Sequence, residues 1–300
     1  MTYPTERTRR AFLRDCGLLA GGMASGAPAI AAEAPDLIVT SGEDPKALVR
    51  RAIDELGGMK RFVSRGDVVV VKPNMAWKTG PATAANTNPD LVAALVEMAF
   101  DAGAKQVKVF DRTDRPPDAC YKGSGIADAV SALGATVISQ RDLQDVKVQV
   151  GGANLKEALI ARDALECDCF INVPVAKHHQ TTLLTMSLKN HMGISGDDHQ
   201  KVWHSNIHQS LADFGLWFRP RLTVLDAYRI LVRHGPGGGN VQDVQLVKKC
   251  IAGIDQAAVD AYGATLFGKK AADIPHLAIA GKIGVGEIDL AKIRVREVSA

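Results

Sequence analysis

Residues 172–208 read NVPVAKHHQTTLLTMSLKNHMGISGDDHQKVWHSNIH, and they contain six of the eight histidines of the chain. The stretch begins where an apolar run, Cys169–Val173, stops at Pro174. An apolar run closed by proline predicts a buried strand that ends in a loop. Because open α/β sheets bind ligands at the carboxyl ends of their strands, this stretch predicts a functional site.

Predicted strands and helices alternate along the chain on both sides of this stretch. An uninterrupted β-branched run such as residues 67–71 is typical of a strand that is covered on both faces. The alternation predicts an α/β fold with a mainly parallel sheet and helices on both faces. We expect residues 35–300 to form a single domain, with two lobes as the alternative. The predicted strands are 36–40, 67–71, 107–111, 136–138, 169–173, 222–226, 247–254 and 293–298, and the predicted helices are 45–56, 88–102, 125–133, 156–165, 182–192, 203–217 and 256–267.

The first 34 residues have the pattern of an export signal. Residues 8–14 read TRRAFLR and precede a weakly apolar stretch, residues 16–32, with small-x-small cleavage sites near Ala31 and Ala34. The pattern predicts a twin-arginine signal peptide, and hence a periplasmic protein that meets the twin-arginine translocation machinery. A membrane helix is the alternative, but the apolar run falls short of the roughly 18 residues required. We therefore expect no stable membrane insertion.

Composition limits the classes of partner and cofactor that we expect. The net charge is +3 and aromatic residues make up 5% of the chain, so nucleic acid is not an expected partner. The cysteines lack the closely spaced run of a ferredoxin-type cluster. Cys167 and Cys169 could form a metal pair, but buried thiols are the simpler interpretation. A bound divalent metal or organic cofactor is compatible with the predicted export route, and its identity is unknown.

Polar side chains follow three of the predicted strands. Lys72 and Asn74 follow one strand, Lys177 and His178 follow a second, and Asp226 ends a third. Because such strand ends meet at one edge of the sheet, we expect these groups to share a cleft. A lysine there could hold a carboxylate or phosphate, or act as a base where burial lowers its pKa. A solvated lysine at a strand exit is the alternative.

Two further segments add candidates. Lys189 and Asn190 lie near a predicted helix end closed by Gly193, where a lysine that complements the helix dipole is the alternative interpretation. His234 precedes a glycine-rich loop, residues 235–239, whose backbone amides could approach an anion. A plain flexible loop is the simpler interpretation, because no phosphate-loop lysine and hydroxyl follow it.

His204 and His208 are spaced to share one face of a helix. With His178, His179 or Asp226 they could complete a divalent metal site. No glutamate follows His204 to give the zinc-protease pattern, and two surface histidines are the alternative.

Taken together, these segments resemble the domain of unknown function 362 family, from about residue 65 to residue 298. The family has no settled activity, and the resemblance favours a site role for Lys72 and Lys189. Many members carry ferredoxin-like modules, which implies redox work, but this chain lacks such a module. His234 also stands where the family is more often acidic or small. The matching segments are 70–74, 172–174 with 177–178, 187–193, 222–227, 235–236, 254–255 with 258–261, and 274–295 with 284–286.

We expect an exported cofactor- or metal-dependent enzyme, or a redox-associated factor, that acts on a small anionic ligand. A non-catalytic periplasmic binder of a small anion is the alternative. We also expect Lys72 and Lys189 to lie in a solvated cleft, and His204 and His208 to face His178. The predicted catalytic residues are His178, Lys189 and Asp226, the predicted ligand-binding residues are Lys72, Asn74, Lys177, Asn190 and His234, and the predicted metal ligands are His204 and His208.

The export signal can be tested with a double substitution. Arg9→Lys together with Arg10→Lys should strand the precursor in the cytoplasm, because the translocation machinery reads the arginine pair as an address. Fractionation followed by immunoblotting measures the distribution. Undiminished periplasmic protein in the double mutant would contradict the prediction.

Overall fold

The computed structural model describes residues 36–300, apart from the side chains of His199 and Gln200. The described residues belong to one compact unit. The predicted signal peptide lies outside them, so its assignment stays a prediction. Within the described residues, no helix combines the length and the apolar character that crossing a bilayer requires.

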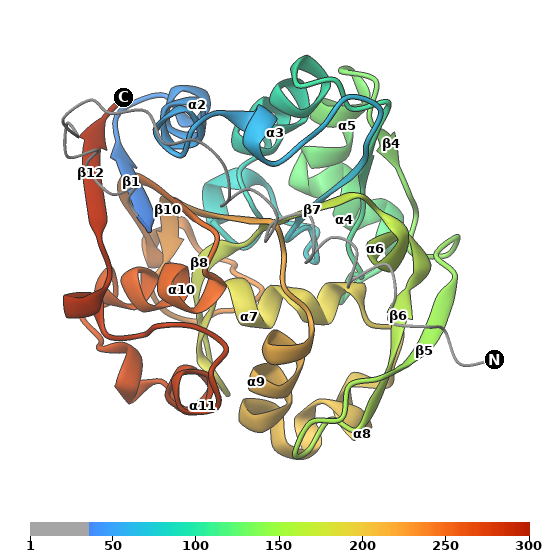
Figure 1. Cartoon of the computed structure of the whole chain (residues 1–300), viewed down its shortest axis with the longest axis vertical. Coiled ribbons are helices and arrows are strands. Elements are labelled where there is room, and N and C mark those ends of the chain that lie inside the picture. The colour runs from blue at the N-terminus through green and yellow to red at the C-terminus, as the bar shows by residue number, and fades with distance from the viewer. Residues whose placement is uncertain (1–35) are drawn as a thin grey trace, which may run out of the picture. The chain divides into compact units, whose positions relative to one another are not determined.

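A ten-stranded sheet forms the centre of the unit (Figure 1). One half is parallel, from β10 to β4, whereas β11 pairs antiparallel with both β10 and β1. The expected α/β class with a mostly parallel sheet is therefore confirmed. In sheet order the strands are β12 (Val295–Ser299), β1 (Leu37–Ser41), β11 (Val244–Gly253), β10 (Leu222–Leu231), β7 (Cys169–Val173), β2 (Val68–Pro73), β3 (Gln106–Val109) and β4 (Thr136–Val137).

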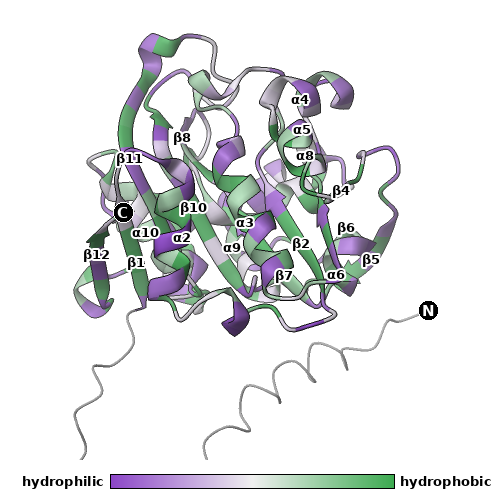
Figure 2. Cartoon of the chain, turned by 90° about the horizontal axis from the view of Figure 1, so that it is seen from above, coloured by the Kyte–Doolittle hydropathy of each residue, from purple (hydrophilic) through white to green (hydrophobic). Residues whose placement is uncertain are grey.

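Helices cover both faces of this sheet. In β1, Ile38 packs into the cluster that contains α2 (Pro45–Glu55), α3 (Pro89–Asp101) and α5 (Ile126–Ser131). Its neighbours Leu37 and Val39 pack into the opposite cluster, beside the helices α10 and α11. Figure 1 shows the two groups of helices on either side of the strands, and Figure 2 shows β1, β2 and β7 as largely hydrophobic. The two helices beside Leu37 and Val39 are α10 (Gln256–Thr265) and α11 (Pro275–Ile283).

The central strands form because their residues suit a strand buried on both faces. β2 reads VVVVKP, and its β-branched side chains favour extended backbone. Its register with β7 pairs Val70 with Phe170 and Lys72 with Asn172. The polar end of β2 therefore lies beside the polar end of β7, which starts the candidate site.

The chain after Pro174 departs from the prediction. Instead of a loop it forms β8 (Val175–His179), which pairs parallel with β10 and antiparallel with β9 (Leu183–Thr185). Because β10 runs on to Leu231, it offers β8 a free edge beyond the end of β7. Proline is tolerated at the start of such a strand, where its missing N–H is not needed.

The helix predicted over residues 156–165 is wrong. β6 (Glu157–Ala161) pairs there with β5 (Asp145–Gln149), and only the short helix α6 (Arg162–Glu166) follows. Alternating exposure along Glu157-Ala-Leu-Ile fits a strand with one covered face. The helix predicted over residues 182–192 is also interrupted, because β9 precedes a single turn, α7 (Ser187–Asn190).

A buried ion pair joins the ends of β2 and β3. Lys72 is 0% exposed and Asp111 1% exposed, and their Nζ and Oδ1 atoms lie 2.8 Å apart. The expectation that Lys72 lies in a solvated cleft is therefore wrong. Met75 N donates to the second oxygen of Asp111 at 2.8 Å, and Lys72 Nζ donates to Asn190 Oδ1 at 2.8 Å. Gly193 closes over the pair, with its carbonyl oxygen accepting from Arg112 N at 2.9 Å.

Gly193 has no room for a side chain, and this can be measured. A Cβ there would lie 1.8 Å from Asp111 Oδ1 and 2.5 Å from Lys72 Nζ. Because overpacking and separation of a buried ion pair both destabilise, Gly193→Ala should lower the free energy of unfolding by at least about 2 kcal/mol in urea.

The matched control is Gly239→Ala, because nothing lies within 4 Å of a Cβ at that position. It should change the free energy of unfolding by no more than about 0.5 kcal/mol. Equal stability of the two variants would show that the ion pair tolerates displacement.

Candidate functional site

Three lysines converge where β2, β8 and α7 meet. Lys177 donates from Nζ to Asn74 Oδ1 at 3.1 Å and to the carbonyl oxygen of Ala85, and it lies 5.9 Å from the centre of the Trp77 ring. Asn74 Nδ2 in turn donates to Asn190 Oδ1 at 3.4 Å, and the same oxygen accepts from Lys72. The two asparagine amides therefore connect the polar ends of the strands with α7.

α7 is held from the strands and from α10. Asn190 Nδ2 donates to Asn172 Oδ1 at 2.8 Å, and Asn172 Nδ2 donates to the carbonyl oxygen of Ser187 at 3.1 Å. On the other side, the buried carboxylate of Asp260 accepts from Ser187 N at 2.7 Å and from Leu188 N at 3.1 Å. These bonds fix the backbone on both sides of the next residue, Lys189.

Lys189 is half-buried, whereas Lys72 and Lys177 are 0% and 1% exposed. Among the described residues, its ammonium makes one hydrogen bond, to Met192 Sδ at 3.5 Å, and a thioether is a weak acceptor. Burial lowers the pKa of Lys189 to about 8, the charge of Asp114 opposes this, and the charge of Lys72 adds to it.

The pKa of Lys177 is lowered further, to about 7, by burial and then by the charge of Lys189. Neutral pH therefore lies close to the pKa values of both lysines. An amine in that range can give up a proton or take one, which an ordinary lysine does poorly.

His179 lies on the Lys177 side of β8. Side chains alternate along a strand, so Lys177 and His179 share one face and His178 takes the other. His179 Nδ1 accepts from Thr181 N at 3.1 Å and from Thr182 N at 3.3 Å, so a neutral ring carries its proton on Nε2. Burial, followed by the charge of Lys189, lowers the pKa of His179 to about 3, so the ring is neutral and donates from Nε2.

His179 was predicted only as a possible metal partner of His204 and His208, and not as a ligand-binding residue, because the sequence predicts a loop here. The two-residue period of a strand would have paired His179 with Lys177. His178 Nδ1 accepts from Gly235 N at 3.2 Å, which ties it to the glycine-rich loop. In that loop, Gly237 packs so closely on Trp77 that a Cβ would meet the ring at 2.8 Å.

Asp226 and His234 are engaged in contacts of their own. Asp226 is 2% exposed and accepts from Asn88 N at 2.7 Å and from Tyr228 N at 3.0 Å. Burial raises the pKa of Asp226 to about 6 despite these bonds. The side chain of His234 is 75% exposed, and its Nδ1 lies 2.9 Å from Asp243 Oδ2. Both arrangements stabilise the loops beside the lysines.

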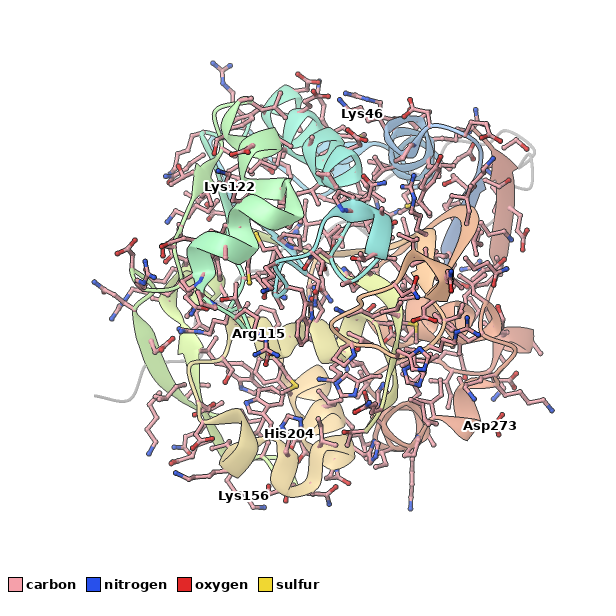
Figure 3. All side chains as sticks on the ribbon, turned by 180° about the vertical axis from the view of Figure 1, so that it is seen from behind. Lys46, Arg115, Lys122, Lys156, His204 and Asp273 are labelled. Atoms are coloured by element: carbon pink, nitrogen blue, oxygen red, sulfur yellow. The ribbon has the colours of Figure 1, made fainter. Side chains whose placement is uncertain are left out.

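His208, one of the two predicted metal ligands, lies beside His276. The ring of His208 lies 6.1 Å from the ring of His276, nearly parallel to it, and His276 is fully buried. Burial, with the charges of His208 and Lys189, lowers the pKa of His276 to about 3. Figure 3 shows His204 and Arg115 on the same face of the unit. Among the side chains that the structure describes, which do not include that of His199, no group of three or more histidine, cysteine or acidic side chains is arranged to hold a metal ion.

The cysteines that the structure describes are free thiols. Burial raises the pKa of the Cys169 thiol to about 12 and that of Cys167 further. Thiols that stay neutral in this way are poor nucleophiles.

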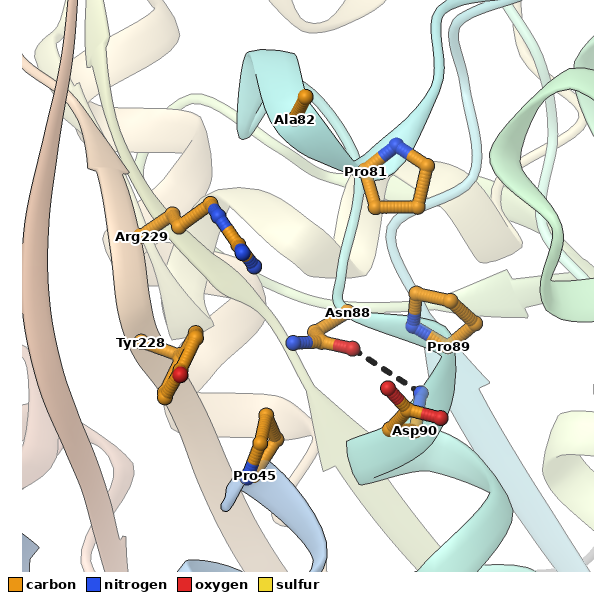
Figure 4. Close-up of a pocket in the computed structure, with 8 residues that line it drawn as sticks. All are labelled: Pro45, Pro81, Ala82, Asn88, Pro89, Asp90, Tyr228 and Arg229. Atoms are coloured by element: carbon orange, nitrogen blue, oxygen red, sulfur yellow. Dashed lines mark hydrogen bonds between the residues drawn. The ribbon is translucent and has the colours of Figure 1, made fainter. Parts of the chain in front are cut away.

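A cavity of about 350 Å³ lies beside the first turns of α2 and α3 (Figure 4). Two of its polar groups have local partners, because Asn88 Oδ1 accepts from Asp90 N at 3.0 Å and the Tyr228 hydroxyl donates to the Glu43 carbonyl oxygen at 2.6 Å, and the Arg229 guanidinium lies 5.0 Å from the centre of the Tyr228 ring. None of the three lysines lines it. We therefore regard the lysine cluster as the stronger candidate site. The cavity is lined by Pro45, Pro81, Ala82, Asn88, Pro89, Asp90, Tyr228 and Arg229.

Comparison with known proteins gives a family and two similar proteins. The chain is 25% identical over 250 residues to the thylakoid-associated protein sll1697 of Synechocystis sp., a match that covers 80% of this chain and 75% of that protein. The lactate racemase apoprotein of Thermoanaerobacterium thermosaccharolyticum has a TM-score of 0.46 and 12% identity, over 79% of this chain and 58% of that one. The model of the domain of unknown function family DUF362 matches residues 69–265, and the chain therefore belongs to that family.

Proposed function

We propose that this protein is an enzyme that binds a small organic anion at Lys177 and Lys189 and moves a proton on it. The observation that carries the proposal is the shortage of acidic groups around three neighbouring amines. Asp111 is taken up by Lys72, and Asp114 lies near the surface with its carboxylate 3.7 Å from Arg115. An anionic ligand would supply the missing negative charge.

The lowered pKa values favour an enzyme over a plain binding protein. A site that only captures anions works best with lysines that stay fully charged. Burial instead brings the pKa of Lys177 to about 7 and that of Lys189 to about 8, which weakens their charge at neutral pH. Amines with such pKa values suit general acid–base catalysis, where the catalytic pKa lies near the working pH.

His179 would complete the recognition of the anion. Its ring is neutral, and the acceptor role of Nδ1 leaves Nε2–H as a donor. The charges of Lys177 and Lys189 both act on this ring, so the three groups occupy one neighbourhood. Two cations and a neutral donor are a set that suits a carboxylate or a phosphate group.

We also propose that the protein works after export through the twin-arginine route, as residues 1–34 suggest. A folded precursor would carry this site across the membrane intact. The substitution of Arg9 and Arg10 described above tests this part separately from the site.

The proposal predicts that affinity for a small anion falls as pH rises through about 7 to 8, because Lys177 and Lys189 lose their charge in that range. Isothermal titration calorimetry of the full-length chain measures this with pyruvate, whose carboxylate stays ionised over this range, and inorganic phosphate, which itself titrates there, is compared at one pH. Lys189→Gln should weaken binding roughly tenfold to a hundredfold, because a hydrogen bond to a charged group contributes about 1.5–3 kcal/mol.

Lys122→Gln is the matched control, because Lys122 is exposed and lies outside the cluster (labelled in Figure 3). It should leave the affinity unchanged. Failure of both anions to bind, or a pyruvate affinity that rises with pH, would overturn the proposal.

A further inference from the structure

The three lysines of the cluster differ in how accessible their amino groups are to a ligand. Lys72 Nζ is held by Asp111 and Asn190, each at 2.8 Å, and the side chain is fully buried. Lys177 Nζ donates to Asn74 and to the Ala85 carbonyl oxygen and lies against the Trp77 ring, so one N–H remains to hold a carboxylate but the nitrogen is not free to attack a carbonyl carbon. Lys189 is half-buried and has a thioether as its hydrogen-bond partner. Of these three amines, Lys189 is the one available for chemistry.

The surroundings of Lys189 also favour its neutral, nucleophilic form. Lysines become nucleophiles where they are desolvated or lie next to another cation, because both effects disfavour the ammonium. Lys72 acts on Lys189 in this sense, and burial is the larger cause of its lowered pKa. The opposing acid, Asp114, is more than half exposed, so solvent screens its charge.

The position of Lys189 is fixed before any ligand arrives. The preceding amides of Ser187 and Leu188 are held by Asp260, and the following residue, Asn190, bonds to both Lys72 and Asn172. A nucleophile on a preorganised backbone needs less reordering when it reacts. The side chain carries the remaining freedom that an attack on a ligand requires.

We infer that the ε-amino group of Lys189 forms an imine with the carbonyl carbon of a small 2-oxo acid, an inference that rests on the proposed binding of small anions here. The ligand needs a carboxylate, to which the Lys177 ammonium and the Nε2–H of His179 would donate hydrogen bonds. It also needs a carbonyl group, because an amine adds to a carbonyl carbon and not to a carboxylate. A 2-oxo acid carries both groups on neighbouring carbons.

The reaction balances without a redox partner. The nitrogen lone pair of Lys189 adds to the carbonyl carbon and forms a C–N bond. The carbonyl oxygen takes one proton from that nitrogen and one from solvent, and it leaves as water when the C–O bond breaks. The product is a protonated imine, whose positive charge makes a proton on the adjacent carbon easier to remove. This is the proton movement that the proposed function requires.

Reductive trapping tests the inference directly. Sodium borohydride added to the full-length chain with pyruvate should deliver hydride to the imine carbon and leave a stable secondary amine. Peptide mapping by mass spectrometry should locate the added carboxyethyl group at Lys189. Lys189→Arg, which keeps the charge, should abolish the labelling, whereas Lys122→Arg should leave it unchanged. Acetate has no ketone carbonyl and should give no label.

The outcomes separate this inference from the proposed function. Pyruvate that binds in calorimetry but leaves no label at Lys189, or labels Lys177 instead, would overturn the imine and leave anion binding intact. Absence of pyruvate and phosphate binding would overturn the proposed function itself. Labelling spread over exposed lysines such as Lys122 would show chemistry without a site, and it would also count against the inference. Because the mapping uses the unsubstituted chain, it remains decisive even where Lys189→Arg folds poorly.

Discussion

The ion pair between Lys72 and Asp111 is the contact on which the site depends. Burial pushes the pKa of the lysine down and that of the aspartate up, and their mutual attraction opposes both shifts. A buried charge without its partner costs several kcal/mol, so the two side chains hold the ends of β2 and β3 together. Their spare hydrogen-bonding groups reach Met75 and Asn190. The pair therefore sets the place of the loop after β2 and of α7 at once.

Hydrogen bonds connect this ion pair to α7, and further hydrogen bonds connect α7 to α10. Asn190 joins Lys72 to Asn172, and Asp260 holds the amides at the start of α7. Burial raises the pKa of Asp260 to about 7, so its charged form is costly, and the two amide hydrogen bonds oppose that cost. A network of this kind specifies one arrangement because each member left unpaired would be penalised. The result is a backbone held on both sides of Lys189, the residue to which the proposal assigns the chemistry.

The sequence predicted the sheet and the polar residues at its strand ends. It did not predict the contacts between distant segments that complete the candidate site. Continuous apolar runs located β2 and β7, and the cap at Asn88 located α3, because these signals are local. Asp111 was predicted only as the last residue of a strand. Its partner Lys72 lies 39 positions earlier, and the two side chains come into contact only in the folded protein. β8 was missed because a proline before a polar segment has the pattern of a loop, whereas the edge of β10 decides its conformation. His276 was missed because its spatial neighbour, His208, lies on a helix that is distant in the sequence.

The balance of charge in the cluster gives the final reason to regard it as functional. Of the three amines in the cluster, Lys72 is paired with a buried carboxylate, whereas Lys177 and Lys189 have carbonyl, amide, ring or thioether partners. Stability alone would favour apolar side chains at these positions, because buried cations without acids are unfavourable. Departures of this kind from the best-packed sequence are expected at functional sites. Lys72 is buried in an ion pair, whereas Lys189 is half-buried beside a sulfur, and this difference supports the proposal that Lys189 is the lysine that meets a ligand.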